Sequence, residues 1–288
     1  MIVSMRKNGM REPVIVGARR MTASKRKVFE QLGDVKVFSL EDATYSLPCY
    51  KPLMMLQART PYVTWVDADG FFRGNCSERL KPVLADQIHV RVRGPEEEAV
   101  AFRGFASSSE DPAHIPALIL NAWRDDVNGL SRPLITRSCL SCLISVHATS
   151  REFLRKWHNQ TMDMLPPGDV DGSDPVLKYY HLLSESVFNS MLAFWSKAPR
   201  VSPSYALDKD PNACYIHFPA RPKPWRGWPS ESIAHFSEYV ALVEWARKQG
   251  FRLPGKVPFA LKRRNRILCS ILQIPVACVA RIVRLFWR

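Results

Sequence analysis

The first quarter of the chain alternates short apolar runs with longer segments of helical pattern. The apolar runs predict strands at residues 13–17, 35–38 and 62–66, and the intervening patterns predict helices at 22–32 and 50–59. Strands that alternate with helices in this way pair into a parallel sheet. The sequence therefore predicts an α/β fold with a mostly parallel sheet flanked by helices.

Two carboxylates follow the third predicted strand. Asp67-Ala68-Asp69 comes directly after the run Tyr62–Val66 and precedes Gly70. Side chains two residues apart leave a strand on the same side, and ligands of open parallel sheets bind beyond the carboxyl ends of the strands. Oxygen ligands suit Mg²⁺ or Mn²⁺, which could hold a diphosphate. The alternative is that Asp67 and Asp69 only cap a turn.

A second segment supplies complementary groups late in the chain. After a short apolar run, the residues from Ile216 to Trp225 read I-H-F-P-A-R-P-K-P-W. His217 offers an imidazole to a metal ion, and Lys223 offers a positive charge to phosphate oxygens. A structural histidine at a strand end is the alternative. Together with Asp67 and Asp69, this segment predicts a metal-diphosphate site.

These motifs resemble a known family. An apolar strand, Asp67-Ala68-Asp69 and a later His217-Phe218 followed by Lys223-Pro224-Trp225 are similar to nucleotide-sugar glycosyltransferases of the GT-A fold. The most similar group is glycosyltransferase family eight, which contains glycogenin and bacterial lipopolysaccharide glycosyltransferases. Its signature reads H-F-x-G-x-x-K-P-W, and Ala220 stands here at the glycine position. The resemblance spans about residues 13 to 228 and implies a Rossmann-type sheet, with Mn²⁺ or Mg²⁺ held by Asp67, Asp69 and His217.

Further site residues follow from this resemblance and from the strand ends. Ser184–Asn189 aligns with the family's D-Q-x-x-x-N segment, which places Glu185 at the glutamine position and Asn189 at the asparagine. Residues 138–146 stand where the family has a small-residue strand that lines the sugar pocket. Glu185 is the candidate carboxylate near the anomeric carbon, and Asp174, in an acidic loop or plain turn, is the second choice. An exposed helix glutamate is the alternative for Glu185.

The nucleotide is expected between the first and third strand ends. Arg19 follows the first strand and could contact the base or a phosphate, or could equally be a solvated loop charge. The resemblance adds Lys223, Trp225 and Asn189 to the candidate donor-binding residues. It also implies a nucleotide-sugar donor, with a UDP-sugar as the expected one, and retention of the anomeric configuration.

The last segment of the chain concentrates positive charge beside apolar residues. The net charge is +14, and basic residues at 262–266 precede the uncharged run 267–280. That run is shorter than the roughly 20 apolar residues of a membrane span. Arg281, Arg284 and Arg288 fall on one helical face, which favours a tail at 256–288 that lies on an anionic membrane surface. A packed C-terminal helix is the alternative, and a nucleic-acid partner is not expected.

The cysteines and the first residues indicate the compartment. Seven cysteines are scattered along the chain without the density of a disulfide framework. Residues 1–12 include Arg6, Lys7 and Arg11 and lack the apolar core of a signal peptide. We expect a cytoplasmic protein, peripheral on the inner face of the membrane.

Three functions are consistent with these observations. The first is a metal-dependent hexosyltransferase that moves a sugar from a nucleoside-diphosphate sugar to a glycan or lipid-linked acceptor, in surface polysaccharide or lipopolysaccharide synthesis. The second is a catalytically inactive, membrane-associated binding protein of the same fold. The third, metal-dependent phosphoryl transfer, is disfavoured because the sequence has no G-x-x-x-x-G-K-[ST] loop. The expected organisation is a GT-A-like glycosyltransferase domain at residues 1–255, followed by the basic amphipathic tail at 256–288.

Overall fold

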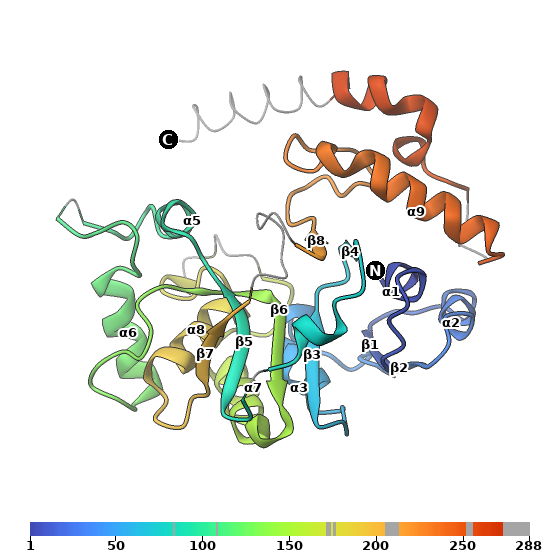
Figure 1. Ribbon diagram of the computed structural model, residues 1–288. Coiled ribbons are helices and arrows are strands. Elements are labelled where there is room, and N and C mark those ends of the chain that lie inside the picture. Colours follow the sequence, from blue (N-terminus) through green and yellow to red (C-terminus); the bar gives the residue numbers. More distant parts are fainter. Residues whose placement is uncertain are drawn as a thin grey trace.

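A four-stranded sheet lies at the centre of the molecule (Figure 1). The computed structural model describes residues 1–82, 84–107, 109–170, 174, 177–204, 213–251 and 256–272. The sheet order is β3-β6-β5-β7, and β6 runs antiparallel to both of its neighbours while β7 runs parallel to β5. Three strands therefore point one way and β6 points the other. Their bounds are β3 Tyr62–Val66, β5 Gln87–Val92, β6 Cys139–His147 and β7 Arg200–Pro203.

The α/β class is confirmed, and the pairing of the sheet departs from the expected parallel one. The first two predicted strands, β1 (Val14–Ala18) and β2 (Val35–Ser39), are parallel to each other, with α2 (Ala23–Glu30) between them in sequence. The third predicted strand, β3, pairs with β6 in the antiparallel sense. The apolar run of β6 is buried along almost its whole length, as a central strand requires, but burial on both faces does not encode direction.

Helices pack against the central sheet, and buried aromatic side chains fill the core between them. Every residue of α8 (Ser184–Phe194) except Glu185 is buried, and the contacts of the helix include α6 (Ala117–Val127) and α7 (Arg151–Met164). Trp123 and Trp157 are fully buried there. The burial of each such large side chain contributes about 1.5–3 kcal/mol. The remaining helices are α1 Ile2–Lys7, η1 Leu47–Tyr50, α3 Lys51–Met55, α4 Ser77–Leu80, α5 Pro95–Ala101, η2 Ala148–Ser150, η4 Ile233–His235, α9 Phe236–Lys248, η5 Phe259–Leu261 and η6 Arg263–Asn265.

A second, short antiparallel pair joins two distant parts of the chain. β4 (Gly70–Phe72) follows the Asp67-Ala68-Asp69 triplet, and β8 (Tyr215–His217) pairs with it so that Gly70 lies opposite His217. In Figure 1, the pair lies above the central sheet, below α9. The aromatic side chains of Phe72 and Tyr215 contact each other across the pair, with ring centroids 4.9 Å apart. This pairing places Asp69, the residue before Gly70, beside His217.

Gly70 fits this pairing because it has no side chain. A Cβ atom on Gly70 would lie 2.4 Å from the carbonyl oxygen of Ile216 and 2.4 Å from the Tyr215 hydroxyl. We expect Gly70→Ala to lower the free energy of unfolding by about 1–3 kcal/mol, because the backbone of β8 must move. Chemical denaturation measures this change. Gly74→Ala is the matched control, since nothing lies within 4 Å of a Cβ there, and equal effects of the two substitutions would contradict the prediction.

The described part of the predicted tail, residues 256–272, contacts α9 and the loop that contains Trp228. The Trp228 indole donates to the carbonyl oxygen of Ala260 at 2.8 Å, and Arg263 pairs with Glu244 of α9. Residues 266–272 are helical. The predicted arginine face at 281, 284 and 288 lies outside the described residues, and the domain boundary at residue 255 stays a prediction. No helix among the described residues is long and apolar enough to span a membrane.

Candidate active site

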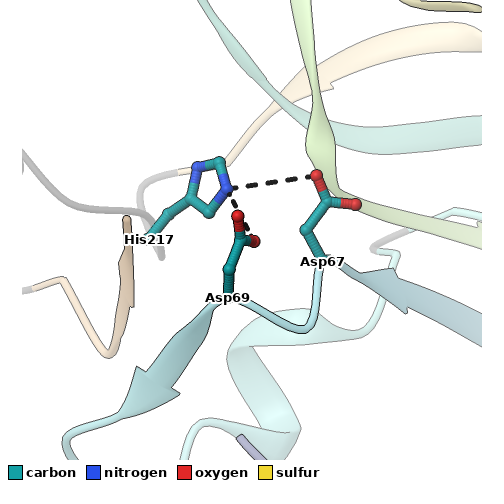
Figure 2. Close-up of side chains that lie close together, drawn as sticks. All are labelled: Asp67, Asp69 and His217. Carbon is teal, nitrogen blue, oxygen red and sulfur yellow. Dashed lines mark hydrogen bonds and ion pairs between the residues drawn. The ribbon is translucent and has the colours of Figure 1, made fainter. Parts of the chain in front are cut away.

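The two predicted aspartates and the predicted histidine meet at one point. The imidazole Nε2 of His217 lies 3.1 Å from Asp69 Oδ1 and 4.0 Å from Asp67 Oδ2 (Figure 2). One ligand atom from each residue falls within 4.8 Å of the others, and all three side chains are partly buried. Two carboxylates and one imidazole form a donor set that fits Mn²⁺ or Mg²⁺. This half-buried group could therefore hold a divalent metal ion.

Backbone contacts fix the positions of these three residues. The Asp67 amide donates to the carbonyl oxygen of Cys142 on β6 at 2.9 Å, which continues the β3-β6 ladder. The Phe218 amide donates to the carbonyl oxygen of Asp69 at 2.9 Å, which continues the β4-β8 ladder. The Tyr215 hydroxyl donates to the Asp67 carbonyl oxygen. The carboxylates are thus held between two sheets, where neither strand pair can shift without moving them.

Lys223 contacts Asp69 directly. Its Nζ lies 2.6 Å from Asp69 Oδ2, and it also donates to the carbonyl oxygens of Phe218 at 2.5 Å and Pro219 at 3.1 Å. Burial opposes the ionisation of Asp69, but the hydrogen bonds and charges of His217 and Lys223 outweigh it. The pKa of the Asp69 carboxyl group is therefore held well below its usual value. Asp69 remains ionised throughout the physiological pH range.

Lys51, which the sequence analysis did not single out, contacts the other carboxylate. Its Nζ lies 3.0 Å from Asp67 Oδ1, and it donates to the Ser141 carbonyl oxygen at 3.0 Å and to the Ser141 hydroxyl at 3.2 Å. The Trp65 indole donates to the same Asp67 oxygen at 2.6 Å. Lys51 is only 5% exposed. A lysine inside the apolar segment around α3 was the available signal, because lysines are rarely buried without a charged partner.

A cavity of about 720 Å³ opens beside this group. Glu185, at the start of α8, lies on its wall and accepts hydrogen bonds from the Ser141 amide at 2.7 Å and the Ser141 hydroxyl at 3.0 Å. Its other oxygen pairs with the Arg93 guanidinium. Burial by itself would raise the pKa of Glu185. The charge of Arg93 and the Ser141 hydrogen bonds lower the pKa by more than burial raises it, so the net shift is downward. The cavity wall is completed by residues from several distant parts of the chain, namely Pro48, Lys51, Asp67, Arg91, Arg93, Glu97, Leu140, Ser141, Cys142, Leu182, Leu183, Ser184, His217, Pro219, Glu231, Ser232 and His235.

A continuous chain of polar contacts connects the two candidate functional carboxylates. It runs from Asp67 through Lys51 and the Ser141 hydroxyl to Glu185, and continues to Arg93. Arg93 is also a residue that the sequence analysis missed. It directly follows β5, in which Ile88 and Val90 are fully buried, and a register shift separates Val90 from Val92. Because such a shift breaks the period of two, the alternation of β5 gave no signal for the side on which Arg93 lies.

Four other predicted site residues lie outside the described wall of the cavity. Arg19 pairs with Asp169 at 2.9 Å, and Trp225 is 36% exposed. Asn189 is fully buried, and its amide accepts from the Cys139 amide at 2.6 Å and donates to the Cys139 carbonyl oxygen at 3.0 Å. Asp174 accepts from the Leu177 amide through its backbone oxygen, while most of its acidic loop (171–173 and 175–176) lies outside the described residues. The roles of these four residues stay predictions.

The alanine at the glycine position of the signature is compatible with the local backbone. Among the described non-glycine residues, left-handed φ angles occur at Arg20, Asn128 and Leu183, and not at Ala220. A residue with a Cβ atom therefore adopts the conformation at position 220 without the strain that a left-handed backbone imposes.

The mixed sheet and the Asp-Asp-His group at its edge define a GT-A-like fold. No family model matches the chain, and no curated protein is detectably similar in sequence. Two solved structures share the fold at a TM-score of 0.50 each. The bifunctional glycosyltransferase WbbM, solved in the apo form, is 13% identical over 80% of this chain, which spans about half (49%) of WbbM. The galactosyltransferase LgtC, solved with donor and acceptor sugar analogues, is 11% identical, and the match covers 92% of both chains. The resemblance to family eight is consistent with these neighbours.

Proposed function

We propose that this chain is a metal-dependent glycosyltransferase that moves a sugar from a nucleoside-diphosphate sugar to an acceptor hydroxyl. The observation that carries the proposal is the position of Asp67, Asp69 and His217 at one side of a cavity whose wall also presents Glu185. A metal-diphosphate site can stabilise the leaving group, and a carboxylate on the same cavity can act at the anomeric carbon. The GT-A-like fold shared with two glycosyltransferases supports the proposal.

The metal-binding side of the cavity would stabilise the leaving group. Asp67, Asp69 and His217 would hold a Mn²⁺ or Mg²⁺ ion, which supplies positive charge to the departing diphosphate when it is bound. Lys223 lies beside Asp69 and carries three N–H donors on a flexible side chain. It would donate to phosphate oxygens as negative charge develops there. Lys51 would keep Asp67 oriented toward the ion.

Glu185 would act on the sugar. A carboxylate whose pKa is lowered is a weak base, so proton abstraction from an acceptor hydroxyl is not the role that its surroundings favour. A fixed negative charge suits the stabilisation of an oxocarbenium-like centre, or nucleophilic attack on it. Arg93 and Ser141 position this carboxylate through three contacts. Retention of the anomeric configuration, which the family resemblance implies, is part of the proposal.

The finer assignments extend the same proposal. The donor is a UDP-sugar that carries a hexose, with contacts from Arg19 and Trp225, while Asn189 would support the donor site through the backbone of β6. Asp174 is the second candidate carboxylate. The acceptor is a glycan or a lipid-linked saccharide in surface polysaccharide or lipopolysaccharide synthesis. The family resemblance supports these assignments.

We also propose that the protein binds the cytoplasmic membrane face through its C-terminal segment. Ile267, Leu268, Ile271 and Leu272 are between 44% and 76% exposed, and their spacing places them on one side of the helical residues 266–272. Basic residues from 262 to 266 precede them. An exposed apolar face beside positive charge suits an anionic bilayer surface.

The exposed apolar face makes a testable prediction for membrane binding. The double variant Ile267→Ser/Ile271→Ser should bind vesicles that contain phosphatidylglycerol at least about tenfold more weakly than the unmodified protein, because it loses buried apolar area at the membrane. Cosedimentation with vesicles measures the binding. Val100→Ser is a matched control, since Val100 is 64% exposed but lies on α5. Unchanged binding of the double variant would refute the assignment.

Release of nucleoside diphosphate tests the proposed activity. The purified protein is incubated with a panel of UDP-, GDP-, CDP- and dTDP-sugars, with Mn²⁺ or with a chelator, and the free nucleoside diphosphate is quantified. Metal-dependent release from one donor supports the glycosyltransferase. The departures at Ser184 and Ala220 from the family pattern favour one alternative, an inactive binding protein of the same fold. Nucleotide binding without release from any donor would indicate that alternative.

A further inference from the structure

The aspartate pair of the candidate metal site already has two positively charged partners from the protein. Lys51 Nζ lies 3.0 Å from an Asp67 oxygen, and Lys223 Nζ lies 2.6 Å from an Asp69 oxygen. Two carboxylates and two ammonium groups sum to a formal charge of zero. A typical all-oxygen site for a hard cation relies on uncompensated negative charge. This site therefore offers a divalent ion the right ligand atoms but little net attraction.

The two lysines differ in how firmly they are held. Lys51 is almost fully buried, and besides Asp67 it is fixed by two oxygen atoms of Ser141. Its ammonium group cannot leave Asp67 without an unpaired charge in the protein interior. The side chain of Lys223 is 21% exposed, and its other partners are two backbone carbonyl oxygens of its own loop, at Phe218 and Pro219. Lys223 is therefore the partner that can move.

The charges explain what would make such a site bind its metal. A divalent ion at Asp67, Asp69 and His217 would lie close to both ammonium groups and be repelled by them. A diphosphate group would supply negative charge to the ion and an alternative acceptor for Lys223. Each ligand would thus remove an obstacle to the other, and the two affinities would rise by the same factor, as thermodynamic linkage requires.

We propose that Lys51 and Lys223 are built-in counter-cations of the aspartate pair, which make tight metal binding conditional on a nucleoside diphosphate, with Lys223 as the exchanging partner. The inference rests on the proposed function only in its choice of diphosphate as the second ligand. It goes beyond that function because it assigns Lys223 opposite effects on the two ligands. Lys223 weakens the binding of the metal alone and strengthens the binding of the metal-diphosphate complex.

Direct measurement of Mn²⁺ binding tests this proposal without any turnover. Bound Mn²⁺ is quantified by electron paramagnetic resonance, alone and with UDP, GDP, CDP or dTDP, with correction for the Mn²⁺ that the free nucleotide binds. In the unmodified protein, the best nucleotide should tighten Mn²⁺ binding by about tenfold or more. Lys223→Met should bind Mn²⁺ alone about tenfold more tightly than the unmodified protein, and the effect of the nucleotide should shrink.

Two control variants separate charge from shape. Lys223→Arg keeps the positive charge and should behave like the unmodified protein toward Mn²⁺ alone. Lys51→Met removes the buried charge and should also tighten the binding of Mn²⁺ alone, provided that its circular dichroism spectrum matches that of the unmodified protein. If Lys51→Met does not fold, the comparison of Lys223→Met with Lys223→Arg decides the proposal by itself.

The possible outcomes distinguish this inference from the proposed activity. Equal or weaker binding of Mn²⁺ alone by Lys223→Met would overturn it, as would an unmodified protein that binds no Mn²⁺ under any of these conditions. Tighter binding by Lys223→Met with an undiminished nucleotide effect would also overturn the conditional role. If Lys223→Met behaves as expected but no sugar donor is consumed, the counter-cation role stands and the glycosyltransferase proposal fails.

Discussion

Asp69→Asn is expected to reduce metal-dependent release of nucleoside diphosphate by about 10³-fold or more, because it removes a charge that would hold the proposed metal ion. Asp69 provides one oxygen to His217 and the other to Lys223, so the substitution disturbs both neighbours. The rate of release from the preferred donor, measured at saturating Mn²⁺, tests this expectation.

The control for Asp69→Asn is the same chemical change at the surface. Asp86 pairs with Arg200, and both side chains are largely exposed, so Asp86→Asn should leave the rate almost unchanged. Thermal unfolding of both variants separates lost chemistry from lost structure. A folded Asp69→Asn protein that retains the metal-dependent rate would contradict the assignment of the metal site.

Replacing Glu185 by glutamine is expected to lower the turnover number by about 10³-fold, with a smaller effect on donor binding, because the negative charge acts mainly on the transition state. Glutamine keeps the size of the side chain and can still accept a hydrogen bond from Ser141. Steady-state kinetics with the preferred donor measures the two effects separately. Glu97→Gln is the matched control, since Glu97 also lies on the cavity wall and pairs with an arginine.

The lowered pKa of Glu185 adds a pH dependence to this prediction. A carboxyl group with a lowered pKa stays ionised as the pH falls, and its stabilising contribution is lost only as the pH drops through the folded-state pKa. Turnover should therefore show no acidic limb due to Glu185 from pH 7 down to about 5. In Glu185→Ala, added azide or formate should restore part of the rate if the carboxylate acts on the sugar. A merely structural glutamate would give no such rescue.

The sequence predicted the strands of the first quarter of the chain closely, because hydrophobic periodicity reports which face of a segment is buried, whereas the helix predicted at 50–59 ends at Met55. The strand Tyr62–Val66 appears with the predicted bounds, and the two motifs that follow strands lie side by side. The direction of β6 was not predictable, since a strand buried on both faces reads the same in either direction. Pairing partners depend on contacts between distant segments, which periodicity does not encode.

The candidate site shows the same division between local and distant information. Asp67, Asp69 and His217 could be proposed because each stands at a strand end beside a recognisable motif. Lys51 and Arg93 could not be placed, because their significance arises only when Lys51 meets Asp67 and Ser141 and when Arg93 meets Glu185. Asn189 matches a family position, but its amide is occupied by the backbone of β6. A sequence match identifies the type of residue at a position, but it does not show whether the side chain points into the cavity.

The pairing of β4 with β8 has a consequence for the order in which the protein becomes functional. Asp69 and His217 are 148 positions apart in the sequence, and they meet only when Tyr215–His217 has added to Gly70–Phe72. A ribosome releases the N-terminal part of a chain first, so the aspartates emerge long before the histidine. The nascent chain thus carries an incomplete set of metal ligands during most of its synthesis. Assembly of the candidate metal site is therefore one of the late steps in the synthesis and folding of this protein.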